Sequence, residues 1–276
     1  MMNRATLQEL QTGVEAIVRV VGRYLKDQLG AVRTADVQEK SLKSLVSYVD
    51  RTAEQMLVEG LRKCLPTAGF VTEEGTVEQG RQAVRWIIDP LDGTTNFLHG
   101  IPAFCISVAL EDAGSIVIGC IYEPLRDELF SAASGCGATL NGKVLSVSAN
   151  QEPGKALGAT GFPYVMGDAE GAMMLMYADM LRQTRGLRRI GSAAIDLAWV
   201  AAGRFDFFYE PWLNPWDVAA GHLLVEEAGG IVTDFSGGNH AIFGGQILAA
   251  SPALHPWVMN RLKASGMAGL PFREVV

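Results

Sequence analysis

The sequence predicts an α+β protein, folded as a layered α/β sandwich in which layers of helices and sheets alternate. Apolar residues spaced three and four apart indicate helices at both ends of the chain, and short apolar segments between Gly, Pro and Asp indicate strands. Helices and strands come in blocks rather than in strict alternation, which favours layers over a doubly wound sheet. With no repeat or composition break to mark a linker, we expect residues 1–276 to form one domain.

The N-terminal part is predicted to be helical. Leu7, Leu10 and Val14 begin an apolar periodicity that continues to Leu25. A polar stretch at 26–44 follows, which we expect to be a loop or a short hairpin. A second helix is predicted from about Asp50 until Pro66 stops it. The Asp50 carboxylate would then complement the dipole at the helix N-terminus.

The middle of the chain is predicted to be rich in strands. Four short apolar segments are separated by turn residues, at 84–89, 104–110, 115–122 and 128–133. Asn141-Gly142 predicts a hairpin turn, because both residues tolerate positive φ. Among the later elements we expect helices at 173–182, 193–203, 217–230 and 255–266, and strands at 205–210, 231–235 and 246–251.

Composition excludes several classes of protein. Hydrophobic residues make up 49% of the chain, too many for a disordered protein. The net charge of −7 argues against general nucleic-acid binding, which needs a basic surface. No apolar run reaches the roughly 20 residues of a membrane helix, and the N-terminus has no apolar signal core. The four cysteines lack CxxC spacing, so we expect reduced thiols and a cytoplasmic protein.

The most informative stretch is the acidic segment 85–97. An apolar strand runs into Asp89, and we expect Pro90 to end its ladder. Asp89 and Asp92 would point to opposite faces if the strand continued, whereas a turn at Pro90 can gather both carboxylates and the Leu91 carbonyl. Such oxygen ligands suit Mg²⁺. A satisfied Asp-Gly turn is the alternative, but two acids at one strand end would repel each other without a cation.

An anion site is predicted beside this metal site. Gly93 allows a ligand close to the backbone, and Thr94-Thr95-Asn96 is expected to open a short helix whose free N–H groups bind phosphate. Glu73, after an apolar pair, and Asp217, at a predicted helix start, are further candidates. Each of these two acids alone would be read as an ordinary turn or cap residue.

The motifs DPLDGTTNF and WDVAAG, with EEG before them and GCGATLNG and GSAAIDLAWVAAGRFDFFYE between them, resemble the inositol monophosphatase family. The resemblance implies lithium-sensitive, Mg²⁺-dependent hydrolysis of myo-inositol monophosphate by activated water, with two or three Mg²⁺ per site, in a homodimer. The wider superfamily includes fructose-1,6-bisphosphatases, 3′-nucleotide phosphatases and histidinol phosphatases, and these substrates remain the alternatives.

The resemblance also implies roles for individual residues. Glu73 and Thr94 would orient and deprotonate the attacking water, and Asp50 would act through metal-bound water. The implied metal ligands are Glu73, Asp89, the Leu91 carbonyl, Asp92 and Asp217. The implied substrate contacts are Asp92, Gly93, Thr94, Thr95, Gly191, Ser192, Ala193, Glu210 and Asp217.

A basic segment allows a function of another class. Arg182, Arg185, Arg188 and Arg189 are expected to form a solvated face or interface ion pairs, but they would also attract an anionic substrate. The third interpretation is a docking patch for RNA or a transcription complex, because some bacterial relatives also act in transcription complexes. A dual role of this kind is therefore the alternative to a dedicated phosphatase.

Overall fold

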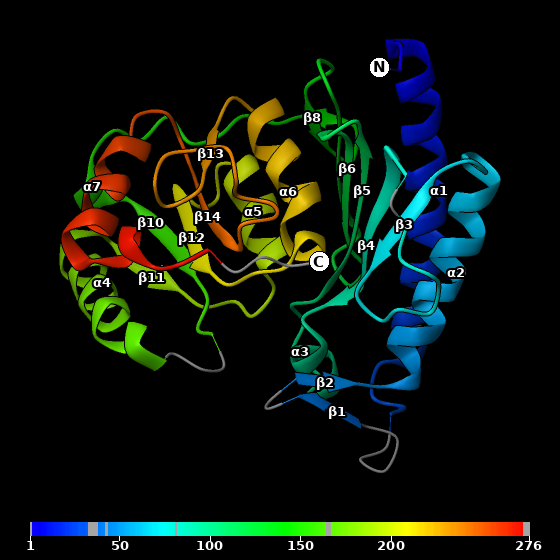
Figure 1. The fold of residues 1–276 in the computed structure, drawn as a ribbon, viewed down its shortest axis with the longest axis horizontal. Coiled ribbons are helices and arrows are strands. Elements are labelled where there is room, and N and C mark those ends of the chain that lie inside the picture. The colour runs from blue at the N-terminus through cyan, green and yellow to red at the C-terminus, as the bar shows by residue number, and fades with distance from the viewer. Residues whose placement is uncertain (1, 33–37, 42–43, 81, 164–166, 273–276) are drawn as a thin grey trace.

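The computed structural model describes residues 2–32, 38–41, 44–80, 82–163 and 167–272, without the side chains of 38–41, 44–46 and 168. Helices and sheets alternate in five layers (Figure 1). The layers are, in order, an outer helix pair, a seven-stranded sheet, a middle helix pair, a five-stranded sheet and a second outer helix pair. In that order the pairs are α1 (Arg4–Gln28) with α2 (Tyr48–Cys64), α5 (Ala193–Ala201) with α6 (Pro215–Glu227), and α4 (Glu170–Gln183) with α7 (His255–Ser265). The layered α+β prediction is confirmed.

The seven-stranded sheet has the strand order β3-β4-β5-β6-β7-β8-β9. Its edge strand β3 is parallel to β4, and the other pairs are antiparallel. Asn141 and Gly142 both have positive φ and form the predicted turn between β8 and β9. The strand bounds are Gly69–Thr72, Val84–Asp92, Cys105–Asp112, Ser115–Glu123, Glu128–Ala133, Ala138–Leu140 and Lys143–Val144.

The five-stranded sheet has the order β11-β10-β12-β14-β13. Its strands β12 (Phe207–Pro211), β13 (Ile231–Thr233) and β14 (Gln246–Ala250) confirm the three late strands predicted. Strands β10 (Leu157–Thr160) and β11 (Gly186–Arg188), like β3, were not predicted, because each is short and contains a glycine, which weakens the strand pattern. The polar stretch forms a hairpin, β1 (Gln38–Ser41) with β2 (Ser44–Val46). Its positions 33–37 and 42–43 lie outside the described residues.

The first two helices follow their apolar periodicity. Leu7, Leu10, Val14 and Leu25 are buried along α1, which Asn3 caps by accepting from the Thr6 N–H. Helix α2 begins two residues before the predicted start, because Ser47 caps it and accepts from the Val49 N–H. It ends at Cys64, just before Pro66, as predicted.

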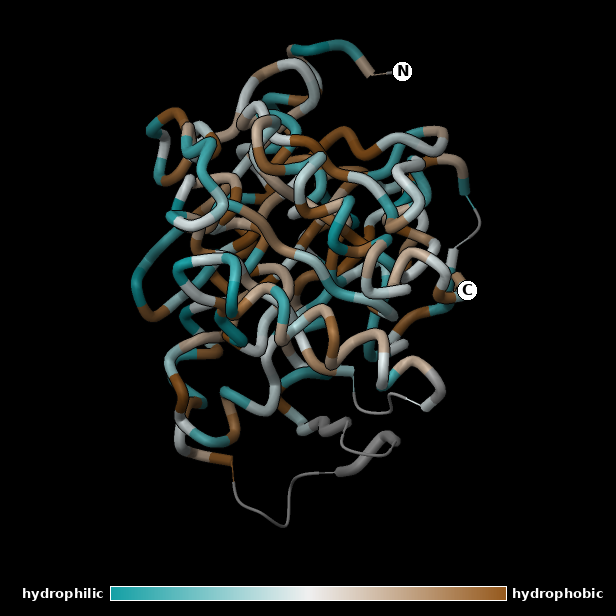
Figure 2. The backbone as a smooth tube through the Cα atoms, turned by 90° about the vertical axis from the view of Figure 1, so that its left-hand side faces the viewer, coloured by the Kyte–Doolittle hydropathy of each residue, from teal (hydrophilic) through white to brown (hydrophobic). Residues whose placement is uncertain are grey.

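Three apolar cores hold the layers together, and Figure 2 shows the hydrophobic stretches of the trace gathered inside the fold. The middle helices pack closely on the large sheet. A Cβ on Gly119 of β6 would stand 2.6 Å from the Ala220 carbonyl oxygen of α6, so glycine is required there. This close packing brings the start of α6 to the end of β4. No described helix has the length and apolar content to cross a membrane.

Candidate active site

A bulge at the end of β4 places the two central carboxylates on one face. Asp89 pairs with Ser107 and Asp92 with Cys105, so β4 advances three residues while β5 advances two. Because side chains alternate along a strand, the one extra residue returns Asp92 to the face of Asp89. The prediction that Pro90 ends the ladder is therefore wrong, since β4 continues to Asp92. A bulge tolerates proline, which has no N–H to donate.

The next turn joins this strand end to α2. Gly93, with φ +94°, begins α3 (Thr94–Leu98), and a Cβ there would stand 2.9 Å from the Ala103 carbonyl. The Thr94 Oγ lies 3.0 Å from both the Leu91 carbonyl and Asp50 Oδ1, its two hydrogen-bond acceptors. Asp50 is buried and accepts from the Ser47 N–H and hydroxyl through its other oxygen. The hydroxyl of Thr94 is thereby held between the strand end and α2.

Two more acids reach the same region from separate elements. Glu73 directly follows edge strand β3, and its N–H donates to the Ile88 carbonyl of β4 at 3.2 Å. Asp217 lies in the first turn of α6 and accepts from the Asn214 N–H at 2.7 Å. The Ser107 hydroxyl of β5 donates to the Trp216 carbonyl, which ties this turn to the sheet. Both acids act electrostatically on Asp89.

The start of α5 forms another side of the site. Ser192 caps this helix, and its hydroxyl donates to Asp92 Oδ2 at 2.7 Å. The Ala194 N–H donates to the same oxygen, also at 2.7 Å. The Asn96 amide of α3 donates to the Ile190 carbonyl, which holds the turn through Gly191 and Ala193 next to α3. The structure thus brings these predicted substrate residues close to Asp92.

Burial, and after it mutual repulsion, raises the pKa values of the acids at the centre of the site. Burial, followed by the charges of Glu73, Asp92 and Asp217, raises the pKa of Asp89 well above its ordinary value. Burial and the charges of Asp92 and Glu73 likewise raise the pKa of Asp217. Burial raises the pKa of Asp92 to about 6, although the hydrogen bonds from Ser192 and Ala194 oppose this change. Ionised carboxylates are therefore unfavourable in this cluster, and a bound cation would reduce the unfavourable free energy.

The donor set fits Mg²⁺. Glu73, Asp89, Asp92 and Asp217 supply carboxylates, and Leu91 a carbonyl, and such hard oxygen ligands are what Mg²⁺ prefers. Across the residues that the structure describes, no three His, Cys, Asp or Glu side chains are already drawn together as a closed metal site. The fit therefore rests on the chemistry, burial and mutual repulsion of the donors.

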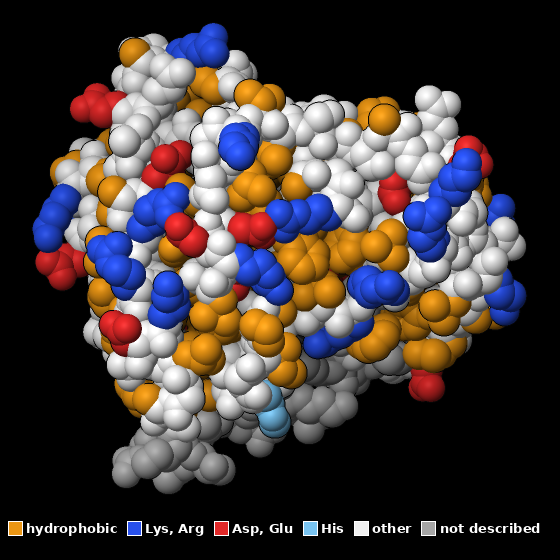
Figure 3. All heavy atoms as spheres, turned by 180° about the vertical axis from the view of Figure 1, so that it is seen from behind, with side chains coloured by type: hydrophobic (Ala, Val, Ile, Leu, Met, Phe, Trp, Pro, Cys, Tyr) orange, Lys and Arg blue, Asp and Glu red, His pale blue; other side chains and the backbone are white. Residues whose placement is uncertain are grey.

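Glu210, on β12, lies at the rim of this site. Burial raises its pKa to about 8, while the charge of Arg189 opposes this change. Arg189 is exposed, like Arg182, Arg185 and Arg188, but its charge also lowers the pKa of Asp92. Of the four arginines, Arg189 thus acts on the acidic site. Lys and Arg are spread over both halves of the face seen in Figure 3 rather than gathered in one patch.

Metal-free protein is expected to lose stability as the pH rises, partly through Glu210. Its pKa rises from 4.5 to about 8 on folding, so the unfolded chain loses this proton first. The free energy of unfolding therefore falls between these pH values and levels off above about 8. Melting temperatures in EDTA from pH 5 to 9 should fall less steeply for Glu210→Gln than for wild type or for Glu152→Gln, an exposed control. An unchanged slope in Glu210→Gln would contradict this assignment.

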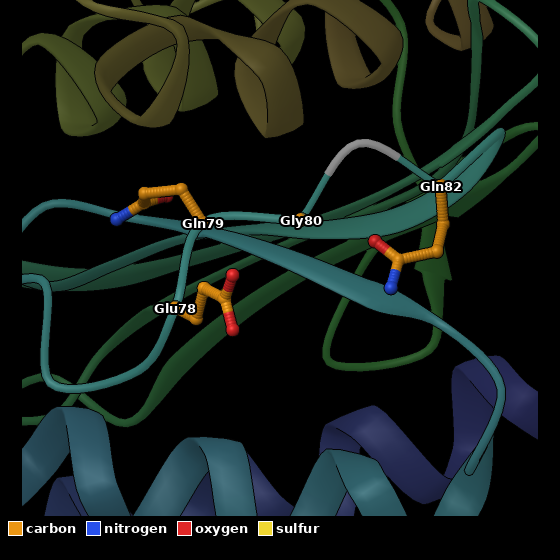
Figure 4. A pocket seen from close by; sticks show the side chains of 4 residues that line it. All are labelled: Glu78, Gln79, Gly80 and Gln82. Atoms are coloured by element: carbon orange, nitrogen blue, oxygen red, sulfur yellow. The ribbon is translucent and has the colours of Figure 1, made fainter.

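Two nearby features supply neither a metal ligand nor a nucleophile to this site. Cys105 Sγ lies 3.5 Å from the Ser192 hydroxyl, but burial raises the pKa of the thiol well above its ordinary value, so it is a poor nucleophile. A separate hollow is lined by Glu78, Gln79, Gly80 and Gln82 (Figure 4), and none of the site acids is among these lining residues.

Two buried acids beside the site, Asp196 and Glu54, were not predicted from the sequence. Asp196 of α5 is 2% exposed, and in the described part of the chain no donor reaches its Oδ1. Its signal was a single acid in an otherwise apolar helix. Glu54 lies one turn after Asp50 on α2 and is fully buried. Its signal was the spacing of four, which places two acids on one helix face.

Known proteins of similar sequence agree with the family that the motifs resemble. A sequence profile of the inositol monophosphatase family matches residues 6–267. The chain is 41% identical over 255 residues to a Mesorhizobium japonicum protein named inositol-1-monophosphatase, an alignment that covers 92% of this chain and 96% of that one. It is 42% identical over 238 residues to a Pseudomonas aeruginosa protein named Nus factor SuhB, with 84% and 88% covered.

A solved structure agrees with the fold. The crystal structure of the extragenic suppressor protein suhB from Bartonella henselae matches with a TM-score of 0.86 at 40% sequence identity. The match covers 92% of this chain and 98% of that one. The layered arrangement is therefore shared over nearly the whole chain.

Proposed function

Since the chain belongs to the inositol monophosphatase family, a family of phosphatases, we propose that it hydrolyses myo-inositol monophosphate to inositol and phosphate in a Mg²⁺-dependent reaction. The observation that carries the proposal is the convergence of four carboxylates from β4, α6 and the end of β3 beside the start of α5. As part of the same proposal, the enzyme holds two or three Mg²⁺ per site and is a homodimer.

The acids would bind the metal, and neighbouring groups would prepare the water. Bound Mg²⁺ would lower the pKa of a coordinated water and neutralise charge on the phosphate and the leaving oxygen. Glu73, Asp89, Asp92 and Asp217 would hold the ions with the Leu91 carbonyl. The hydrogen of the Thr94 hydroxyl is committed to Asp50 or Leu91, so its oxygen can accept from the attacking water. Glu73 would accept the proton of that water.

The substrate would lie between the strand end and the start of α5. The N–H groups at Gly93, Thr94 and Thr95 would bind phosphate oxygens. Glu210 would hydrogen-bond the inositol hydroxyls beside the turn through Gly191, Ser192 and Ala193. As the water oxygen bonds to phosphorus, the bond to the ester oxygen would break. The ester oxygen would take up a proton from solvent water, and the proton accepted by Glu73 would be released to solvent. The products are inositol and inorganic phosphate.

A substrate panel tests this proposal. Phosphate release would be measured with and without Mg²⁺ from inositol 1-phosphate, fructose 1,6-bisphosphate, 3′-phosphoadenosine 5′-phosphate and histidinol phosphate. We expect a Mg²⁺-dependent preference for inositol 1-phosphate, and inhibition by Li⁺ when Mg²⁺ is limiting. A preference for another compound would keep the chemistry and replace the substrate. No Mg²⁺-dependent release from any of them would contradict the proposal.

A second role in a transcription complex is the other candidate. It is favoured by the relatives named Nus factor SuhB, such as the Escherichia coli protein at 40% identity, and by the four exposed arginines on 182–189. Transcription-complex binding that survives in Asp89→Asn would separate this role from phosphatase activity. Wild-type protein that does not bind such a complex would exclude it.

A further inference from the structure

The turn that carries Glu73 is held by a buried carboxylate outside the acidic site. Glu54 of α2 accepts from the Glu74 N–H through one oxygen, at 2.7 Å. Its other oxygen accepts from both the N–H and the hydroxyl of Thr76, each at 2.7 Å. Charged acceptors form the stronger hydrogen bonds. Glu54 therefore fixes the backbone immediately after Glu73.

The backbone immediately before Glu73 is held by a second side chain. Thr72 lies on edge strand β3, where, among the residues that the structure describes, the backbone groups on the outer side have no neighbouring strand. The Gln79 side chain pairs with both of them, since it accepts from the Thr72 N–H and donates to the Thr72 carbonyl, each at 3.0 Å. Figure 4 shows Gln79 and Glu78 pointing to opposite sides of the segment that returns past the sheet. The Gln79 amide thus acts as one residue of an additional strand.

The hydrogen bonds from the turn to Glu54 and Gln79 oppose the electrostatic repulsion that acts on Glu73. Its charge is repelled by Asp89, Asp92 and Asp217, and a turn on an edge strand could relax outward to relieve that repulsion. The hydrogen bond from the Glu73 N–H to Ile88 would not by itself hold both sides of the turn. Buried hydrogen bonds to Glu54 make such a movement costly, because the carboxylate would lose its donors.

We infer that Glu54 and Gln79 are positioning residues, which hold Glu73 against the repulsion of its neighbours and so preorganise the site for a divalent cation. The inference rests on the proposed function, because it assumes that Glu73 is a metal ligand. Groups that orient metal ligands in this way commonly change metal affinity by about 10- to 100-fold when they are replaced.

Replacing Glu54 by glutamine removes one acceptor and keeps the size. The amide nitrogen would face the N–H of Glu74 or of Thr76, so at least one of these donors would lose its partner. Glu59→Gln is the matched control, since Glu59 is exposed on the same helix and pairs only with Lys63 among the described residues. Gln79→Ala, on the exposed side of the turn, is the milder variant.

The experiment measures metal binding directly in the full chain. Mn²⁺, which accepts the same oxygen ligands, is titrated and the free ion is followed by electron paramagnetic resonance. We expect the Mn²⁺ Kd to rise about tenfold or more in Glu54→Gln, to rise by a smaller factor in Gln79→Ala, and not to change in Glu59→Gln. The KM for inositol 1-phosphate at saturating Mg²⁺ should remain near the wild-type value in both test variants, because neither residue is among the proposed substrate contacts.

The outcomes separate this inference from the proposed function. Wild-type protein that binds no Mn²⁺ would overturn both. Wild-type protein that binds Mn²⁺, with wild-type affinity in a folded Glu54→Gln, would overturn the inference alone. If circular dichroism shows that Glu54→Gln does not fold, Gln79→Ala decides, and an unchanged Kd in that variant overturns the inference.

Discussion

Asp89→Asn is expected to reduce Mg²⁺-dependent phosphate release by at least about a thousandfold while leaving the metal-free protein as stable as wild type or more stable. The two effects have one cause. Asp89 is 1% exposed, and its charge is opposed by burial and by Glu73, Asp92 and Asp217. The amide removes this repulsion and keeps an oxygen that can accept from the Leu91 N–H, as Asp89 Oδ1 does at 2.8 Å.

The measurement combines phosphate release with thermal unfolding in EDTA at pH 8, which lies above the pKa of about 6 of Asp92. Mg²⁺ should raise the melting temperature of wild type more than that of Asp89→Asn, because a bound ligand stabilises only the state that binds it. Asp27→Asn, which replaces an exposed acid at the end of α1, is the control and should behave as wild type. Substantial activity in Asp89→Asn, or a clear loss of metal-free stability, would argue against a carboxylate held ready for a cation.

Glu73→Gln should lower kcat by about 10²- to 10³-fold, and saturating Mg²⁺ should not restore it. Glu73 is proposed both to bind metal and to accept the proton of the attacking water. Excess Mg²⁺ can compensate for weaker binding, but it cannot replace the proton acceptor, because an amide does not accept a proton at neutral pH.

The test is kcat as a function of Mg²⁺ concentration, with Glu78→Gln as the control. Glu78 is exposed on the same returning segment. A Glu73→Gln enzyme that regains the wild-type kcat at high Mg²⁺ would leave Glu73 as a metal ligand only. It would remove Glu73 from the activation of water.

Local patterns in the sequence were enough to predict the layered class and most of the longer elements. The periodicity from Leu7 to Leu25 and the Asn141-Gly142 turn act over a few neighbouring residues, so they can be read without the fold. The strands β3, β10 and β11 could not be predicted in this way, because each is short, contains a glycine and is stabilised by pairing with distant strands. The roles assigned to the site residues as metal ligands, catalytic groups and substrate contacts, Thr95 and Glu210 among them, stay predictions.

The identities of the candidate metal ligands were determined by the sequence, because long motifs such as DPLDGTTNF carry chemical groups in a fixed order. The positions of these ligands in space were not determined by local sequence, because they depend on groups that are far apart in the chain. The bulge opposite Ser107 and Cys105 places Asp89 and Asp92 on one face, where the sequence suggested a turn at Pro90. The hydrogen bonds from Glu54 and Gln79 to the turn around Glu73 also needed the folded chain, since they depend on how α2 packs beside an edge strand.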